Sequence, residues 1–386
     1  MTQSRKAIIV GAGIGGLTAA IALQRAGWQV EVFEAAQALR TEGSGLSVMS
    51  NAMAALHSID AHGPVAEAGQ AIRHFYFKDK NGRTITRLPI HEVGEELGHP
   101  SVNIQRPLLL KALAGQLTPG TIRTGRRCTG YTHLANGVSV AFDGGACHTA
   151  DLLIGADGLN SMVRRQMLGE TCVRSSGYIA WLAVTPFEAP ATTPGTVAHY
   201  WGQGKRFGLC DVGDGHVYWW GTCNQPDAAL AAQSLSKYEV LQAYSGWAPE
   251  VLAAIEATPP ARILKVHARD RDPVTQFCDA HVALLGDAAH PMLPSLGQGA
   301  AQAIEDAVVL ADCIARNPEL PAALATYEAI RLPRANDVVK AARSMSGIEQ
   351  TQSRFLCWLR ERYLRLTPQS SLRKKNLALL SFKLPT

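Results

Sequence analysis

One glycine pattern near the start of the chain constrains the fold more than any other feature. Gly11, Gly13 and Gly16 fit the spacing G-x-G-x-x-G, between an apolar run at 6–10 and an Ala- and Leu-rich stretch at 17–26. In such a loop the first glycine permits a tight turn, the second lets the backbone approach a pyrophosphate, and the third lets strand and helix pack closely. The pattern predicts a β-α-β unit that binds a dinucleotide at the helix N-terminus.

An acidic residue at the end of the next strand supports this interpretation. The predicted strand 29–33 is followed by Glu34, eighteen residues beyond Gly16. A carboxylate there accepts hydrogen bonds from the ribose of an adenosine. The alternative is an ordinary glycine-rich turn, but the preceding strand, the following helix and Glu34 favour a nucleotide loop, which also includes Gly15. The loop alone leaves FAD and NAD(P) open as ligands.

Two later segments distinguish between these ligands. An apolar strand at 151–156 ends in Asp-Gly, and another at 281–285 ends in Gly-Asp, before a glycine pair that opens a predicted helix at about 298–315. A carboxylate at the C-terminal end of a strand points into the cofactor crevice, where it can accept hydrogen bonds from a polyol. FAD contains ribitol and NAD does not, so these segments favour FAD. Their candidate cofactor residues are Asp157, Gly158, Gly286, Asp287, Gly297 and Gly299.

The three motifs together resemble the FAD-dependent aromatic hydroxylases, the group A flavoprotein monooxygenases of salicylate-hydroxylase and p-hydroxybenzoate-hydroxylase type. The motifs occur in the family's order, and the resemblance covers nearly the whole chain. It implies that Arg40 and Arg106 contact FAD, because they stand where the family places FAD-contacting arginines. The chain departs from the common pattern at Ala301, where many members carry an Asn that helps to position the flavin.

The resemblance also implies a reaction. In this family NAD(P)H reduces FAD, O2 adds to form a C4a-hydroperoxyflavin, and one oxygen passes to an aromatic or electron-rich heterocyclic small molecule. The chain has no second strand–GxGxxG–helix unit, so NAD(P)H is expected to bind transiently in a cleft. The helix that begins at 297–299 would direct N–H groups at the negative charge of reduced flavin, and Pro294 would shape the peroxide pocket. The alternatives are a flavin-dependent reductase or dehydrogenase without oxygen transfer, and a non-catalytic flavin-binding protein.

The segment 178–221 is rich in aromatic and β-forming residues and predicts an antiparallel sheet that covers the substrate. Within it, Arg206 and Tyr218 are candidates for the substrate or flavin edge, and together with Pro294 they form the candidate catalytic set. The alternative gives them roles in sheet packing and surface charge. The run Gly204-Lys-Arg206 and Tyr218 resemble the urate hydroxylases, but Ser295 stands where that subgroup carries Asp, so urate is not predicted.

These segments predict an α/β fold with three parts. The first is a discontinuous Rossmann-type FAD-binding domain at 1–74, 99–173 and 268–340. The second is an inserted, mostly antiparallel β-sheet substrate domain at 75–98 and 174–267. The third is a C-terminal helical segment at 341–386.

Other residue patterns argue against a metalloprotein, a secreted protein and a membrane-spanning protein. The eight cysteines form no Cys-x-x-Cys pair, so no metal site is predicted, and His290, Glu305 and Asp306 are expected to be structural. The apolar run near the N-terminus has no separate cleavage site and no long hydrophobic segment, which predicts neither a signal peptide nor a membrane span. We therefore expect a cytoplasmic monomer or homodimer whose partners are a small substrate and O2, without nucleic acid.

The net charge of +5 comes from one segment. Residues 341–386 contain nine basic and two acidic residues, whereas the rest of the chain has a net charge of −2. Within this segment, 354–366 carries apolar residues at helical spacing between arginines. Two interpretations remain: a helix for a membrane surface or an interface, or a helix packed on the FAD domain with solvated arginines, which is favoured.

Overall fold

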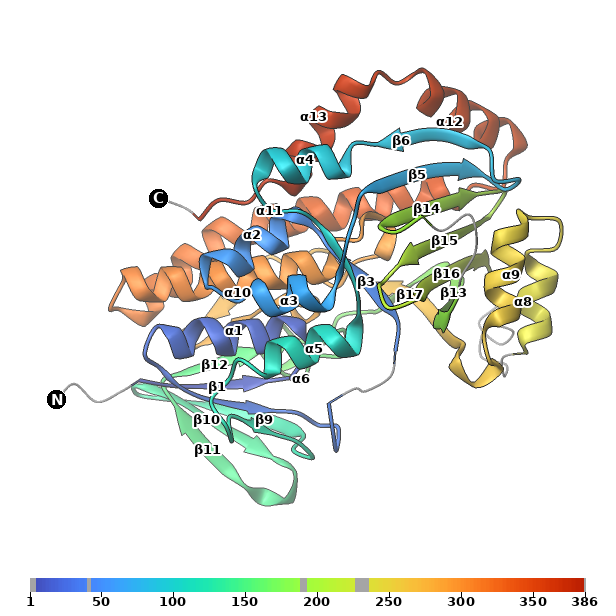
Figure 1. The fold of residues 1–386 in the computed structure, drawn as a ribbon. Coiled ribbons are helices and arrows are strands. Elements are labelled where there is room, and N and C mark those ends of the chain that lie inside the picture. The colour runs from blue at the N-terminus through green and yellow to red at the C-terminus, as the bar shows by residue number, and fades with distance from the viewer. Residues whose placement is uncertain (1–4, 40–42, 188–192, 226–235, 385–386) are drawn as a thin grey trace.

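The computed structural model describes residues 5–39, 43–187, 193–225 and 236–384. The structure contains two large sheets, with helices packed on the first and a pair of helices on one face of the second (Figure 1). The predicted α/β fold with an inserted antiparallel sheet and C-terminal helices is confirmed. Among the helices of these described residues, none is both long enough and apolar enough to cross a bilayer.

The first large sheet has six strands in the order β18-β19-β12-β1-β2-β8. Its neighbours pair in parallel except at its edge, where β18 runs antiparallel to β19. The central strands are short apolar runs buried on both faces, as a parallel sheet covered by helices requires. The strands are β1 (Lys6–Val10), β2 (Gln29–Phe33), β8 (Ile122–Arg123), β12 (Leu152–Gly155), β18 (Cys278–Asp279) and β19 (Val282–Leu284).

Helices pack around this sheet and share one large apolar core with it. The helix after the glycine loop, α1, packs against α10, and α10 packs in turn against α2 and α11. These helices are α1 (Ile14–Arg25), α2 (Ser50–Ser58), α3 (Gly63–Ala68), α5 (Arg106–Ala114), α6 (Met162–Leu168), α10 (Gly299–Arg316) and α11 (Leu320–Glu349). Short 3-10 turns η3 (Gly286–Ala288) and η4 (Pro294–Leu296) connect β19 to α10.

Two small three-stranded sheets complete this half of the molecule. One contains β9 (Cys128–Leu134), β10 (Gly137–Phe142) and β11 (Cys147–Ala150), with the 3-10 turn η1 (Asp143–Gly145) between the last two. The other contains β3 (Gly45–Val48), β4 (Gln70–Ala71) and β7 (Val102–Gln105). β12 follows β11 almost directly in the chain, but it joins the parallel sheet, where it pairs with β1.

The second large sheet has seven strands in the order β17-β13-β16-β15-β14-β5-β6. All pairs are antiparallel except β14 with β5, which join segments far apart in the chain. The strands are β5 (His74–Asp79), β6 (Thr84–Leu88), β13 (Arg174–Pro186), β14 (Thr196–Trp201), β15 (Lys205–Asp211), β16 (His216–Asn224) and β17 (Leu264–Asp270). The sheet thus extends three residues beyond the expected boundary at 267.

Two short helices cover one face of this second sheet (Figure 1). They are α8 (Lys237–Ala243) and α9 (Pro249–Ala257). Gly246 in the connection has φ 74°, a left-handed conformation that ends a helix. The 3-10 turn η2 (Pro260–Arg262) then leads into β17.

Side chains alternate between the two faces of the second sheet, as the period of a strand requires. Phe207 and Trp219 point to the face that α8 and α9 cover and stack with ring centroids 5.3 Å apart. Arg206, Cys210 and Trp220 point to the other face, towards the first sheet. The strand pattern thereby presents one set of polar and aromatic side chains to the space between the sheets.

The chain ends in helices beside the second sheet. These are α12 (Arg354–Leu366) and α13 (Gln369–Leu380), and they lie with α4 (Ile90–Leu97) near β6 at the top of Figure 1. Of the interpretation that 354–366 packs on the FAD domain with solvated arginines, the exposure of Arg354, Arg362 and Arg365 agrees with the structure, but the helix contacts β6 of the second sheet. Arg360 is the buried side chain of α12 and contacts Gly202, next to β14, while apolar side chains of this helix face outward.

Candidate functional site

One cavity of about 1100 Å³ lies between the two large sheets. It brings together candidates from five separate parts of the chain. The predicted residues that line it are Gly13, Gly15, Arg106, Gly158, Arg206, Tyr218, Gly286, Asp287, Pro294, Gly297 and Gly299. The predicted residues outside its lining are Gly11, Gly16, Glu34 and Asp157. Arg40 lies outside the described residues.

The glycines of the first motif have two different roles. Gly11 has φ 109°, and a Cβ there would lie 2.3 Å from the Ala156 carbonyl oxygen. A Cβ on Gly16 would lie 2.0 Å from the Gly11 oxygen. A Cβ on Gly13, in contrast, would meet no protein atom within 4 Å. Gly11 and Gly16 are therefore required by the fold, whereas Gly13 leaves open space beside the α1 N-terminus, where a pyrophosphate would bind.

Glu34 fixes the shape of this loop from the end of β2. Its carboxylate accepts hydrogen bonds from the backbone N–H groups of Ala12 and Ala36, each at 2.9 Å. Two carboxylate oxygens offer more lone pairs than these two bonds use. The remaining acceptor capacity at this strand end suits the ribose hydroxyls of an adenosine.

Asp157 turns away from the cavity. Its Oδ2 accepts hydrogen bonds from the N–H groups of Met162 (2.7 Å) and Val163 (3.3 Å) in the first turn of α6. Burial raises the pKa of this carboxyl, and these hydrogen bonds oppose the rise. The following residue, Gly158, has φ 78° and lines the cavity. Asp157 thus positions the loop that places Gly158 at the site.

The Gly-Asp motif occupies the turn after β19. Gly286 has φ 58° and donates its N–H to Asp306 Oδ2 at 2.9 Å, which holds the turn against α10. Asp287 lies deep in the protein, but its side chain is exposed to the open space of the cavity. Burial raises the pKa of Asp287, while His290 and Arg106 lower it. A carboxylate here can accept hydrogen bonds from a ribitol chain.

A buried ionic cluster supports this turn from behind. His290 Nε2 lies 2.5 Å from Asp306 Oδ2, and Arg331 Nε lies 2.7 Å from Asp306 Oδ1. Arg331 also pairs with Glu305, which Arg334 bonds at 2.6 Å. Burial raises the pKa of Asp306, but His290 and Arg331 lower it further, to about 2. The expectation that His290, Glu305 and Asp306 are structural is confirmed.

The start of α10 forms the middle of the cavity. Pro294 in η4 lines it, and Gly297 follows with φ 63° before Gly299 begins the 18-residue helix. The first N–H groups of a helix have no intrahelical acceptor, and the helix dipole places partial positive charge there. This end of α10 can therefore stabilise an anion in the cavity. Ala301, two residues after Gly299, is fully buried.

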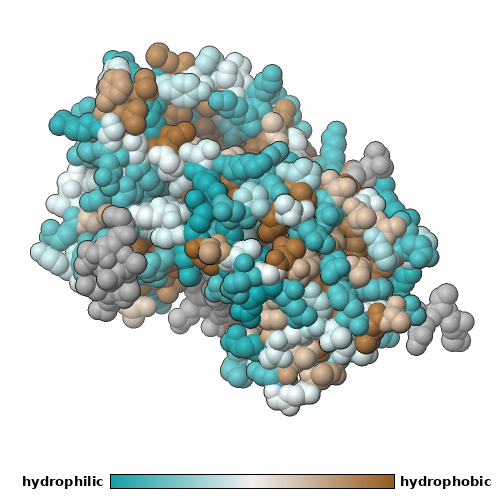
Figure 2. Space-filling view, turned by 180° about the vertical axis from the view of Figure 1, so that it is seen from behind, coloured by the Kyte–Doolittle hydropathy of each residue, from teal (hydrophilic) through white to brown (hydrophobic). Residues whose placement is uncertain are grey.

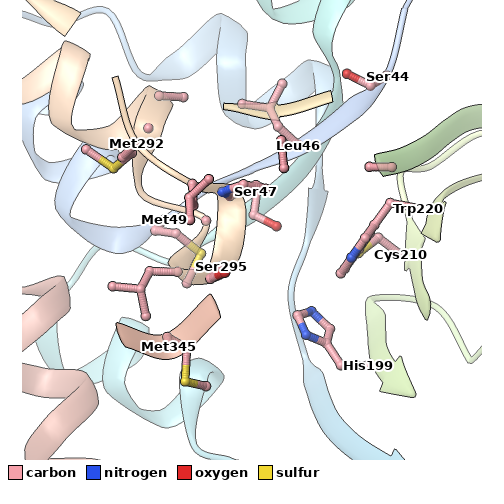
Figure 3. A pocket seen from close by; sticks show the side chains of 18 of the residues that line it. Ser44, Leu46, Ser47, Met49, His199, Cys210, Trp220, Met292, Ser295 and Met345 are labelled. Carbon is pink, nitrogen blue, oxygen red and sulfur yellow. The ribbon is translucent and has the colours of Figure 1, made fainter. Parts of the chain in front are cut away.

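The opposite wall comes from the second sheet (Figure 3). Trp220, Cys210 and His199 lie on one side, and Met49, Ser295 and Met345 lie on the other. His199 packs against Phe75 and Trp220, with ring centroids 4.8 and 4.7 Å apart. Burial, together with Arg206, lowers the pKa of His199 to about 3, so this ring is neutral at physiological pH.

Arg206 is held by a partner that the sequence did not indicate. Its Nη1 lies 2.5 Å from Glu349 Oε2, and the two side chains are only 2% and 1% exposed. Burial raises the pKa of Glu349, while Arg206 and Ser295 lower it. Glu349 ends α11, more than 140 residues from Arg206, so no local pattern joins them. The available signal was that Glu349 is one of two acids in the basic segment 341–386.

The parallel sheet with its glycine loop, the second sheet opposite it and the cavity between them have the architecture of an FAD-dependent oxidoreductase. The chain offers open space beside Gly13, carboxylate acceptors at Glu34 and Asp287, and a helix N-terminus at α10, which are the kinds of group that a dinucleotide cofactor requires. The model of a family described as "FAD binding domain" matches residues 4–342, and the chain belongs to this family, as an FAD-dependent monooxygenase of the aromatic hydroxylase type.

Named relatives are similar over most of their length. The chain is 39% identical to an aurachin C monooxygenase/isomerase of Stigmatella aurantiaca, with 93% of each chain covered. It is 32% identical to a 6-hydroxynicotinate 3-monooxygenase of Pseudomonas fluorescens, covering 93% of this chain and 95% of the relative. A solved structure of the Klebsiella pneumoniae protein HpxO with FAD and uric acid has a TM-score of 0.90 at 29% identity, covering 97% and 96% of the two chains.

Proposed function

We propose that this monooxygenase uses NAD(P)H and O2 to hydroxylate a neutral aromatic or heterocyclic small molecule. The observation that carries the proposal is the single cavity with two chemically different ends, which meet at the start of α10. One end presents glycines and polar groups that fit FAD. The other presents aromatic and sulfur-containing side chains, among which His199 is neutral at physiological pH and Arg206 is paired with Glu349.

The chain's own residues would position FAD at the first end. When bound, FAD supplies the redox chemistry and the activation of O2, while the protein supplies position, electrostatics and exclusion of water. Gly13 would admit the pyrophosphate, and Glu34 and Asp287 would accept hydrogen bonds from ribose and ribitol. Arg106 and Gly158 would line the space between them. The α10 N-terminus would stabilise negative charge on the reduced ring system.

Charge argues for a neutral substrate. Arg206 is the deeply buried basic side chain of the second sheet at the cavity, and Glu349 pairs with it at 2.5 Å. His267 and Arg269 of β17 also line the cavity, but they are exposed to solvent. A carboxylate substrate would have to compete with an ion pair that is already buried and formed. His199 is neutral at physiological pH and therefore adds no attraction. We propose that Arg206 shapes this wall and that Tyr218 and Pro294 touch the substrate.

The decisive experiment follows flavin reduction in the purified yellow protein. Stopped-flow mixing with NADH or NADPH, without O2, would be run with matched pairs of aromatics, each a neutral phenol or hydroxyquinoline and its carboxylated counterpart. We expect the neutral member to accelerate reduction at least tenfold more than the carboxylated one, and urate to have no effect. With 18O2 present, label should appear in the product.

The outcomes separate the alternatives. Rapid reduction without 18O in any product would indicate a reductase or dehydrogenase. Negligible oxidation of both nicotinamides across the panel would indicate a non-catalytic flavoprotein. Preferential acceleration by the carboxylated members would overturn the neutral-substrate proposal and leave the hydroxylase proposal standing.

A further inference from the structure

Helix α12 presents its apolar side chains to the outside. Trp358 is 52% exposed. The other exposed apolar residues of this helix are Phe355, Leu356, Leu359, Tyr363 and Leu366. We call these six residues the α12 apolar patch. In Figure 2 brown side chains gather at the upper left, over this helix, with teal side chains around them. Monomeric soluble proteins rarely expose such a contiguous patch without a binding role.

The inward face of α12 is centred on a buried arginine with the half-buried Cys357 and Leu364 beside it, whereas an ordinary surface helix buries its large apolar side chains. Arg360 is only 7% exposed, and its guanidinium lies 4.7 Å from the ring centre of Trp201. It donates hydrogen bonds to the carbonyl oxygens of Ile348 and Gly202, at 3.1 and 3.2 Å. These directed bonds fix the rotation of the helix. The outward orientation of the patch is therefore built into the fold.

Basic side chains surround the patch. Arg354, Arg362 and Arg365 lie on α12 itself and are exposed. On the adjoining α13, the exposed basic residues are Arg373, Lys374 and Lys375, of which Arg373 pairs with Glu96. The segment 341–386 carries a charge of +7, while the remainder of the chain carries −2. We call these six basic residues of α12 and α13 the basic collar. Apolar side chains surrounded by cations are complementary to the headgroup region of an anionic bilayer.

The cavity extends to these same helices. Tyr363 and Lys375 line it and are also exposed at the surface, so the cavity opens between α12 and α13. Their side chains contact each other, with Lys375 Nζ 3.2 Å from the Tyr363 hydroxyl. Leu364, Leu372 and Leu379 line the same end of the cavity and make it apolar. Tyr363 belongs to both the α12 apolar patch and this opening, so the two adjoin on the surface of the protein.

We propose that α12 and α13 dock this enzyme on the surface of an anionic lipid bilayer, with the cavity opening against the lipid. The apolar patch would enter the boundary between headgroups and acyl chains, and the basic collar would contact lipid phosphates. A second copy of this chain is a poorer occupant, because a symmetric contact through α12 would bring the two basic collars together. Docking does not depend on the proposed reaction. If that reaction holds, apolar substrates reach the site from the lipid.

Co-sedimentation of the FAD-bound protein with vesicles tests the proposal without turnover. The vesicles would contain phosphatidylcholine alone, or phosphatidylcholine with an equal share of phosphatidylglycerol. We expect at least tenfold stronger binding to the anionic vesicles, which weakens as salt rises. A Phe355→Ser/Trp358→Ser variant and an Arg362→Gln/Arg365→Gln variant should each lose at least tenfold in binding. Both should keep the yellow colour and the thermal midpoint of the wild type.

A matched control removes exposed apolar residues elsewhere. Leu134→Ser/Tyr238→Ser changes two exposed side chains on other elements and should bind vesicles as the wild type does. Brominated lipid should quench Trp358 fluorescence, measured as the difference between the wild type and Trp358→Phe. Unchanged vesicle binding by the Phe355→Ser/Trp358→Ser variant would overturn the proposal. So would a dimer in sedimentation equilibrium that this variant abolishes without any vesicle binding by the wild type.

Discussion

The two ends of the cavity are built by different means. We call the end lined by glycines, where FAD is proposed to bind, the FAD end, and the end lined by the second sheet the substrate end. The FAD end depends on the backbone, because glycines at tight turns bring strand ends and helix N-termini around an open space. The substrate end depends on side chains that come from several strands of the second sheet, from η4 and from the end of α11. The first construction follows from a short sequence motif. The second requires the tertiary fold before any residue acquires a partner.

The energetic weak points differ accordingly. At the FAD end, a single added methyl group meets backbone atoms that have no alternative position, as at Gly11 and Gly16. At the substrate end, volume changes are tolerated more easily, but Arg206 and Glu349 depend on each other for charge balance. Substitutions that affect either the backbone packing of the FAD end or the charge balance of the substrate end therefore test this difference directly.

Gly11→Ala should have the largest effect. The new Cβ would lie 2.3 Å from the Ala156 oxygen, at a residue whose φ is 109°, so steric overlap and backbone strain add. We expect a loss of about 4–5 kcal/mol in the free energy of unfolding and a colourless product. Urea unfolding and the flavin absorbance of the purified protein measure both.

The matched variant is Gly13→Ala, in the same loop. Its Cβ would meet no protein atom within 4 Å, so the apoprotein should unfold at the wild-type urea concentration. FAD affinity should nevertheless fall about a hundredfold, because the methyl group enters the space needed by the pyrophosphate. Equal losses of stability in the two variants would contradict the division of roles within the loop.

Glu349→Gln should have the next largest effect. The substitution keeps the shape of the side chain but leaves the buried Arg206 guanidinium without its counterion. We expect about 3 kcal/mol of destabilisation in urea unfolding. Glu361→Gln, an acid on α12, serves as the control and should stay within about 0.5 kcal/mol of the wild type.

A double variant sharpens this result. Arg206→Met/Glu349→Leu removes both charges and should be more stable than Glu349→Gln alone, because no uncompensated charge remains. The neutral pocket should keep its preference for neutral aromatics. The matching single variants are Arg206→Met and Glu349→Leu. If their losses of stability simply add up to that of the double variant, the pair is not coupled.

The same contrast explains what the sequence could predict. The environment of the loop glycines can be predicted from the local sequence, because the spacing of Gly11, Gly13 and Gly16 specifies a turn and a helix start within a few residues. Gly158 and Gly286, which the motif order indicated, also lie at the cavity. Asp157 differs, because a carboxylate at a strand end can turn either to a cofactor or to the next helix, and here it bonds the first turn of α6.

The substrate end was predicted only in outline. Strand alternation puts Arg206 and Cys210 on one face of β15, and Tyr218 and Trp220 on one face of β16, but the alternation does not tell which face of the sheet the helices cover. The pairing of Arg206 with Glu349 requires α11 to return to the second sheet, which no local pattern encodes. In α12 the expectation that apolar residues face inward was wrong, because Arg360 makes the inward contacts.

His199 should make the protein sensitive to acid. Its pKa is lowered to about 3 in the folded protein, against about 6.5 in an unfolded chain. Between these pH values the imidazole is protonated in the unfolded state but not in the folded state. The contribution of His199 to the free energy of unfolding is therefore complete above pH 6.5 and is lost as the pH falls towards 3. We expect His199→Gln to flatten the fall in unfolding free energy between pH 7 and 5 by about 1–2 kcal/mol.

The control for this titration is His267→Gln, at an exposed histidine of β17. Urea unfolding at several pH values measures all three proteins. The His267→Gln curve should parallel that of the wild type. If His199→Gln also parallels the wild type, His199 is not the group that couples protonation to folding.

Tyr218→Phe should have the smallest effect, and it tests the substrate end most finely. Burial raises the pKa of the Tyr218 phenol, which therefore stays protonated at neutral pH and acts as a hydrogen-bond donor. Its ring packs closely on Gly45, so the aromatic contact survives the substitution. We expect unchanged FAD affinity and about a fivefold rise in KM for a neutral aromatic, equivalent to one hydrogen bond of about 1 kcal/mol. A fall in kcat of a hundredfold or more at unchanged KM would instead make Tyr218 a catalytic residue, and the contrast between a rigid FAD end and a merely complementary substrate end would then fail at this position.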